Sequence, residues 1–119
     1  MSGLKIDTEE IDGVTVITLA GELDLNNAAG LKKIFKELDE QDKNQILINC
    51  SELTYIDSSG LGILIRTKAN FTANKKDKKE DLILFDLSEE VDKVIDLTKL
   101  TGFFVVKSDK QSGVDYFKE

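Results

Sequence analysis

A short polar segment, Asp57-Ser58-Ser59-Gly60-Leu61-Gly62, places an acid, two hydroxyls and two glycines between an apolar strand-like segment and an apolar helical pattern. The first amides of a helix have no partner within the helix, and the helix dipole is positive at that end. A phosphate on Ser58 or Ser59 would therefore meet backbone donors that already point toward it. The same segment has a simpler use, because Asp57 or Ser58 can cap the helix. The motif thus predicts a phosphoacceptor serine, a capped helix start, or both.

Enzyme chemistry at these serines is disfavoured by what the sequence lacks. A serine nucleophile needs a base to take its proton, and the chain contains no histidine. The nearest downstream lysine, Lys68, lies about two and a half helical turns away. A metal site is also disfavoured, because the chain has no histidine and only one cysteine, Cys50. We predict no catalytic residue, no metal and no cofactor, and a serine that is the substrate of another enzyme.

The N-terminal residues predict a β-hairpin. Residues 5–11 and the β-branched segment 14–19 are separated by Asp12-Gly13, a dipeptide typical of tight hairpin turns. Gly21 is expected to end the second strand. The hairpin must be antiparallel, so a sheet that also contains helix-linked parallel strands is mixed.

Apolar residues recur at helical spacing over 28–38 and 61–71, which predicts two amphipathic helices. The second is expected to begin at Ser58 or Ser59. A third helix is predicted after Ser88, which is a favourable N-cap, and a short final helix is predicted to begin at Ser112. The first helix has three candidate N-caps, namely Asp24, Asn26 and Asn27.

Three apolar segments, 45–49, 82–85 and 103–106, predict further strands. Helices join them, so these strands should run parallel with right-handed crossovers. The alternation of strands and helices predicts an α/β fold, and the length fits a single domain over residues 1–119.

Composition limits the classes of partner. The chain has 119 residues, 40% hydrophobic content and a formal net charge of −7, which disfavours direct binding to nucleic acid or to an anionic membrane. No apolar segment is long enough to span a bilayer, and no signal-peptide pattern is present. A single Cys50 cannot form an internal disulfide, which suits the reducing cytoplasm. We expect a cytoplasmic protein that is monomeric when free, because no aromatic-rich patch is evident.

Three motifs in register resemble those of the STAS domain family, and within it the anti-sigma factor antagonists. They are Asp57-Ser58-Ser59-Gly60-Leu61-Gly62, Gly21-Glu22-Leu23-Asp24, and the pair Ser88-Glu89-Glu90-Val91 and Leu97-Thr98-Lys99-Leu100. The resemblance spans nearly the whole chain, from about residue 4 to 117. It implies a small mixed β-sheet with an antiparallel edge hairpin and about four helices packed mostly on one face.

The resemblance also implies a partner-switching function. In its unphosphorylated form such a domain binds an anti-sigma factor that is also a serine kinase of the histidine-kinase-like ATPase type, which releases a sigma factor. The kinase then phosphorylates the antagonist, and a serine phosphatase resets it. The phosphoacceptor maps to Ser58, with Ser59 as the alternative. The implied partner surface is formed by Asp24, Asp57, Ser58, Ser59, Gly60 and Leu61.

Two alternatives remain open from the sequence. The alternative to an anti-sigma factor antagonist is a stand-alone STAS subunit of a lipid-transport or stress-sensing complex, since such subunits share the fold that the resemblance implies. It also departs from the family at the Lys-rich segment 74–81, which is a few residues longer than the usual turn. We interpret this segment as a solvated loop or a frayed helix end, because four lysines are interleaved with three acids; the alternative is a basic patch for an acidic partner.

Overall fold

The computed structural model describes residues 3–73 and 79–118. It contains a mixed sheet of six strands in the order β1-β2-β3-β5-β6, with β4 paired to the far end of β2. The β1–β2 pair is antiparallel, and the other pairs are parallel. The strands are β1 (Leu4–Ile11), β2 (Val14–Leu23), β3 (Gln45–Asn49), β4 (Leu53–Ile56), β5 (Asp81–Phe85) and β6 (Val106–Lys107).

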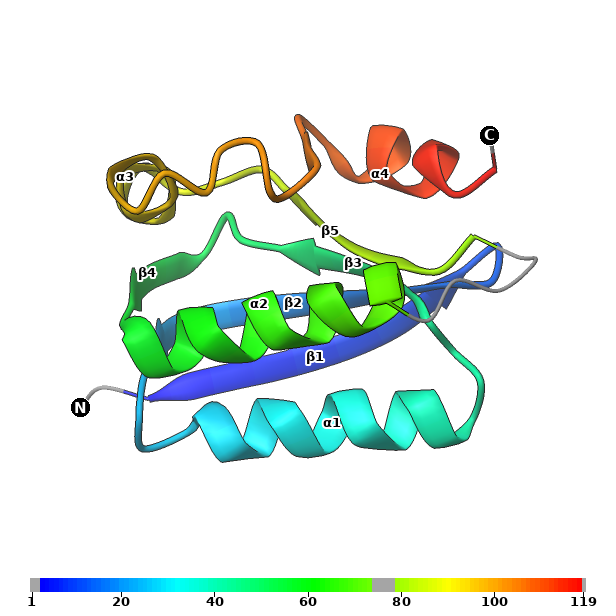
Figure 1. Cartoon of the computed structure of the whole chain (residues 1–119), viewed down its shortest axis with the longest axis horizontal. Helices are drawn as coiled ribbons and strands as arrows, with labels where there is room; N and C mark the ends of the chain where they lie inside the picture. Colours follow the sequence, from blue (N-terminus) through cyan, green and yellow to red (C-terminus); the bar gives the residue numbers. More distant parts are fainter. Residues whose placement is uncertain (1–2, 74–78, 119) are drawn as a thin grey trace.

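Helices cover both faces of the sheet unequally. Three helices pack against one face of the sheet, and together they enclose a core that includes Ile17, Ile46 and Ile48. The short fourth helix packs with the other face, against Leu47 and Ile83, because neighbouring strand residues point to opposite faces. The helices are α1 (Ala28–Glu40), α2 (Ser58–Ala73), α3 (Glu89–Leu97) and α4 (Lys110–Tyr116). Figure 1 shows α1 and α2 side by side, with their N-terminal ends at the same end of the molecule. The predicted α/β fold, edge hairpin and helix distribution are confirmed.

The hairpin forms as predicted, but Gly21 does not end its second strand. Asp12 and Gly13 form the turn with φ angles of 52° and 83°. Gly21 lies inside β2 with a φ of 112°, beside a shift in register. An added Cβ would collide with the carbonyl oxygen of Gly3. Glycine therefore lets β2 bend and continue to Leu23, where it pairs with β4.

Two predicted boundaries in the C-terminal third are wrong. Of the predicted strand 103–106, only Val106 is in a strand, and it pairs with Leu84. Phe103 and Phe104 lie in a turn that follows Leu100, and their rings pack edge to face at 4.9 Å. The last helix begins at Lys110 rather than Ser112, because the Asp109 carboxylate caps it by accepting from the Ser112 amide at 2.8 Å. This hydrogen bond lowers the pKa of Asp109.

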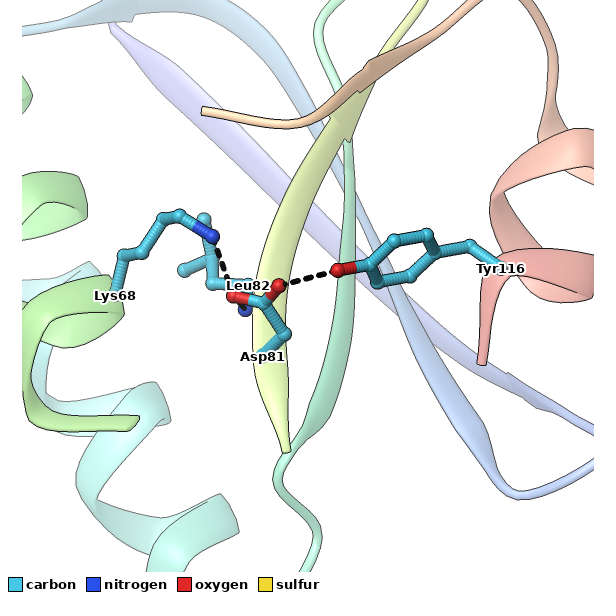
Figure 2. Close-up of polar contacts among 4 residues, drawn as sticks. All are labelled: Lys68, Asp81, Leu82 and Tyr116. Carbon is cyan, nitrogen blue, oxygen red and sulfur yellow. Dashed lines mark hydrogen bonds and ion pairs between the residues drawn. The ribbon is translucent and has the colours of Figure 1, made fainter. Parts of the chain in front are cut away.

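A buried polar network joins α2, β5 and α4 (Figure 2). Lys68 donates to Asp81 Oδ1 at 2.6 Å, and the Tyr116 hydroxyl donates to Asp81 Oδ2 at 2.9 Å. The sequence predicted that Asp81 is solvated, as part of the Lys-rich segment 74–81. This prediction is wrong for Asp81, which is the first residue of β5 and has a side chain only 14% exposed. Residues 74–78 of that segment lie outside the described residues.

Cys50 follows β3 and is fully buried. Burial, with a smaller contribution from the Asp86 carboxylate, raises the pKa of its thiol to about 12. The thiol is therefore protonated at neutral pH and acts as a small apolar side chain. Among the described residues, no helix is both long enough and apolar enough to cross a membrane.

Candidate functional site

The serine motif lies where β4 passes directly into α2. β4 ends at Ile56, and Ser58 is the first residue of the helix. Ser58 is exposed, whereas Ser59 is partly buried. The sequence did not predict β4, because only its two end residues, Leu53 and Ile56, are buried and the usual alternation is missing. This short strand carries the motif to the end of β2.

Asp57 caps α2 and also connects two loops. Its Oδ1 accepts from the Gly60 amide at 3.0 Å, the usual geometry of an N-cap. Its Oδ2 accepts from the Leu25 amide at 3.1 Å, 32 residues earlier in the chain. Both carboxylate oxygens are therefore occupied by backbone donors. The cap predicted for Asp57 is confirmed, and neither serine hydroxyl is needed for it.

Asp24 organises the loop before α1 without being the N-cap of that helix. Its Oδ1 accepts from the Asn26 amide at 2.9 Å, and its own amide donates to Asn27 Oδ1 at 2.9 Å. The N-cap position is taken by Asn27, whose side chain also donates to the Glu22 carbonyl oxygen at 2.8 Å. These hydrogen bonds fix the loop before α1. The bond from the Leu25 amide to Asp57 holds this loop beside the start of α2.

Gly60 and Leu61 do not reach the surface. Leu61 is only 7% exposed and belongs to the main core. Gly60 is buried, and a Cβ added to it would lie 2.6 Å from Leu23 Cγ and 2.9 Å from the Leu23 carbonyl oxygen. The prediction that these two residues contact a partner is not supported by their burial. Their role in the geometry is to seat the first turn of α2 against the end of β2.

One surface residue that the sequence did not reveal lies beside the serine. Leu25 is 74% exposed, although its backbone is held by Asp57. Tyr55, three residues before Ser58, is 49% exposed. An exposed leucine whose backbone is fixed by hydrogen bonds is a suitable apolar contact for another protein. No periodicity marks Leu25 as exposed, so only the folded loop identifies it.

The chemistry available at this site is binding of an anionic group at a helix start. Asp57 satisfies the Gly60 amide with its side chain and the Leu61 amide with its carbonyl oxygen. Within residues 3–73 and 79–118, the amides of Ser58 and Ser59 have no protein acceptor. These two donors are the ones that a phosphate on Ser58 would face. The same described residues contain no cluster of three His, Cys, Asp or Glu side chains that could hold a metal ion.

Comparison with known proteins places the fold and the motifs in one family. The family model for the STAS domain matches residues 5–113. A protein of Staphylococcus epidermidis named anti-sigma-B factor antagonist is 26% identical over 97 residues, which are 82% of this chain and 86% of that protein.

Solved structures agree in fold over almost the whole chain. An anti-sigma factor antagonist from Mycobacterium paratuberculosis has a TM-score of 0.83 at 21% identity, covering 98% of this chain and 96% of that one. The antagonist SpoIIAA in its unphosphorylated form has a TM-score of 0.78 at 23% identity, with 96% of each chain covered. Phosphorylated SpoIIAA from Bacillus has a TM-score of 0.71 at 22% identity, covering 94% of this chain and 98% of that one. Because the family match extends over most of its length, this chain belongs to the STAS domain family.

Proposed function

We propose that this protein is an anti-sigma factor antagonist that is switched by phosphorylation of Ser58. Unphosphorylated, it binds an anti-sigma factor that is also a serine kinase of the histidine-kinase-like ATPase type, and so releases a sigma factor. The kinase phosphorylates Ser58 and the complex dissociates; a serine phosphatase restores the active form. The observation that carries the proposal is an exposed serine at the first position of α2, in a chain whose relatives are named antagonists.

The geometry favours Ser58 over Ser59 as the acceptor. A kinase must bring the hydroxyl to the γ-phosphate of its nucleotide in line, which requires an accessible side chain. Ser58 is exposed, whereas Ser59 is partly buried. Phosphopeptide mapping after treatment with the kinase tests this choice, and phosphate found on Ser59 alone would contradict it.

The fold should tolerate the phosphate while the partner surface does not. The added charge is about −1.5 to −2 at neutral pH, and the amides of Ser58 and Ser59 accommodate negative charge at the helix start. On the outer side, the same charge lies next to Asp57 and beside exposed Leu25, on a chain with a net charge of −7. A partner that packs on this apolar and acidic surface would have to bury a dianion without a cation from this loop.

Ser58→Asp is expected to lower affinity for the anti-sigma factor at least about tenfold, with the melting temperature nearly unchanged. The matched control is Ser108→Asp, which adds the same charge at another exposed serine, next to the start of α4. Wild type and both variants would be used as baits in a host lysate, with bound proteins identified by mass spectrometry. The affinity of the captured kinase would then be measured with purified proteins.

Three outcomes would contradict the proposal. Ser58→Asp could unfold the domain, the control could lose as much binding as Ser58→Asp, or the baits could capture transport-complex subunits equally. The last result would assign the chain to the class of stand-alone transport subunits and leave Ser58 without a switching role.

Leu25→Ala is expected to weaken the same complex about tenfold, because it removes the largest exposed apolar side chain of the loop. The folded state should be unaffected, since Leu25 buries little surface. Leu97→Ala is the matched control, because Leu97 is 80% exposed at the end of α3. Isothermal titration with the purified anti-sigma factor measures both. Equal affinity for wild type and Leu25→Ala would remove this residue from the proposed partner surface.

A further inference from the structure

A groove of about 700 Å³ lies between α1 and α2, and none of its lining residues belongs to the serine motif, 57–62. Its apolar part is formed by Phe35 from α1 and by Ile63 and Phe71 from α2. Phe35 and Ile63 are each 6% exposed, and Phe71 is partly buried. Two aromatic rings and one aliphatic side chain give the groove a surface that suits an apolar ligand body.

The rim of this groove is cationic on an acidic protein. Lys32 and Lys36 lie one turn apart on α1, and Arg66, the only arginine in the sequence, comes from α2. All three side chains are exposed. Within the described part of the chain, none of them forms an ion pair. The rim contains one exposed acid, Asp39. In a chain with a net charge of −7, three cations from two helices around one groove favour an anion there.

The inner end of the groove has an unsatisfied acceptor. Asn44 lines the groove and is 4% exposed. Its Nδ2 donates to Glu80 Oε2 at 3.0 Å, which takes up the second acid of the groove. Its Oδ1 is buried and has no hydrogen-bond partner among the residues that the structure describes. Buried acceptors without a donor are rare and costly, but this oxygen exposes less than 1 Å² of surface, so it is not a contact for a ligand in the groove.

We propose that the groove between α1 and α2 binds a small organic anion with an apolar body. The acidic group would contact Lys32, Lys36 and Arg66, and the apolar body would lie against Phe35, Ile63 and Phe71. None of these residues belongs to the serine motif, so the proposal does not depend on the function proposed for Ser58.

Two fluorescent probes that differ only in charge test the proposal. Anilinonaphthalene sulfonate has an aromatic body, one N–H and a sulfonate; N-phenylnaphthylamine has the same body and N–H without the sulfonate. We expect saturable binding of the sulfonate to the folded protein, at least about tenfold tighter than binding of the neutral probe. Decanoate, as a competitor, distinguishes an aliphatic anion such as a lipid-derived acid from an aromatic one. If decanoate displaces the sulfonate probe, the groove binds aliphatic anions. If decanoate does not displace it and the probe still binds, the groove binds aromatic anions.

Charge reversal at the rim identifies the site. Arg66→Glu is expected to weaken sulfonate binding about tenfold and to leave the neutral probe unchanged. The matched control is Lys33→Glu, which makes the same change at an exposed position of α1 outside the groove. Amide NMR shifts of the wild type should change mainly at Phe35, Ile63 and Phe71. No saturable binding, equal losses in Arg66→Glu and Lys33→Glu, or shifts that centre elsewhere would each overturn the proposal.

Discussion

Asp81→Ala is expected to lower the free energy of unfolding by about 3–5 kcal/mol, because it removes one partner of a buried ion pair. Lys68 and Asp81 have side chains that are 9% and 14% exposed, and their charged atoms lie 2.6 Å apart. Asp81 also accepts from its own neighbour, the Leu82 amide, at 2.8 Å and from the Tyr116 hydroxyl at 2.9 Å. A single truncation therefore disturbs α2, β5 and α4 together.

Two comparisons separate the buried charge from other effects of the substitution. The double variant Lys68→Met, Asp81→Leu should recover most of the loss, because apolar side chains of similar size need no counter-charge. Glu89→Ala breaks an exposed ion pair, in which the side chains of Glu89 and Lys93 are 82% and 71% exposed. This substitution should lower the free energy of unfolding by less than about 1 kcal/mol. Urea denaturation gives all three values. A loss at Asp81 no larger than that at Glu89 would show that the network contributes little to stability.

Local sequence signals predicted the parts of this fold that local interactions determine. Asp12-Gly13 predicted the hairpin, because two adjacent residues with positive φ fit few other structures. Ser88 predicted its helix, and its hydroxyl accepts from the Val91 amide at 3.2 Å. The segment 45–49 predicted a buried strand, which the structure confirms with three fully buried central residues.

The predictions that failed depend on contacts between distant segments. Gly21 was interpreted as the end of a strand, because the sequence does not show that Gly3 lies against it and that β4 pairs beyond it. Phe103 and Phe104 were interpreted as a strand because they are apolar, yet they pack into the main core from a turn. The direction of a side chain in an irregular segment is set by the core that it meets.

The candidate site shows the same division. Asp57 was predictable as a cap, because capping is a local hydrogen bond to an amide three residues later. The bond from the Leu25 amide to Asp57 joins two loops 32 residues apart, and nothing in either motif predicts it. The exposure of Ser58 follows from the start of α2 after β4, whereas the role of Ser58 as phosphoacceptor stays a prediction.

Gly60→Ala is expected to lower the free energy of unfolding by about 3 kcal/mol and to weaken binding of the anti-sigma factor as well. The new Cβ would lie 2.6 Å from Leu23 Cγ and 2.9 Å from the Leu23 carbonyl oxygen. Leu23 is fully buried, and its carbonyl oxygen accepts from the Asp57 amide at 3.2 Å, so neither group can move freely. The first turn of α2 must shift instead, and it carries Asp57 and Ser58 with it.

Gly30→Ala is the matched control, because Gly30 lies in α1 and an added Cβ there meets nothing within 4 Å. This substitution should raise the free energy of unfolding by roughly 0.5–1 kcal/mol, since alanine is the better helix former. Thermal or urea unfolding, followed by binding measurements below the transition, distinguishes the two effects of Gly60→Ala. A variant as stable as wild type that no longer binds would mean that Gly60 matters to the partner directly. A stable variant that still binds would mean that the contact between the start of α2 and the end of β2 does not position Ser58.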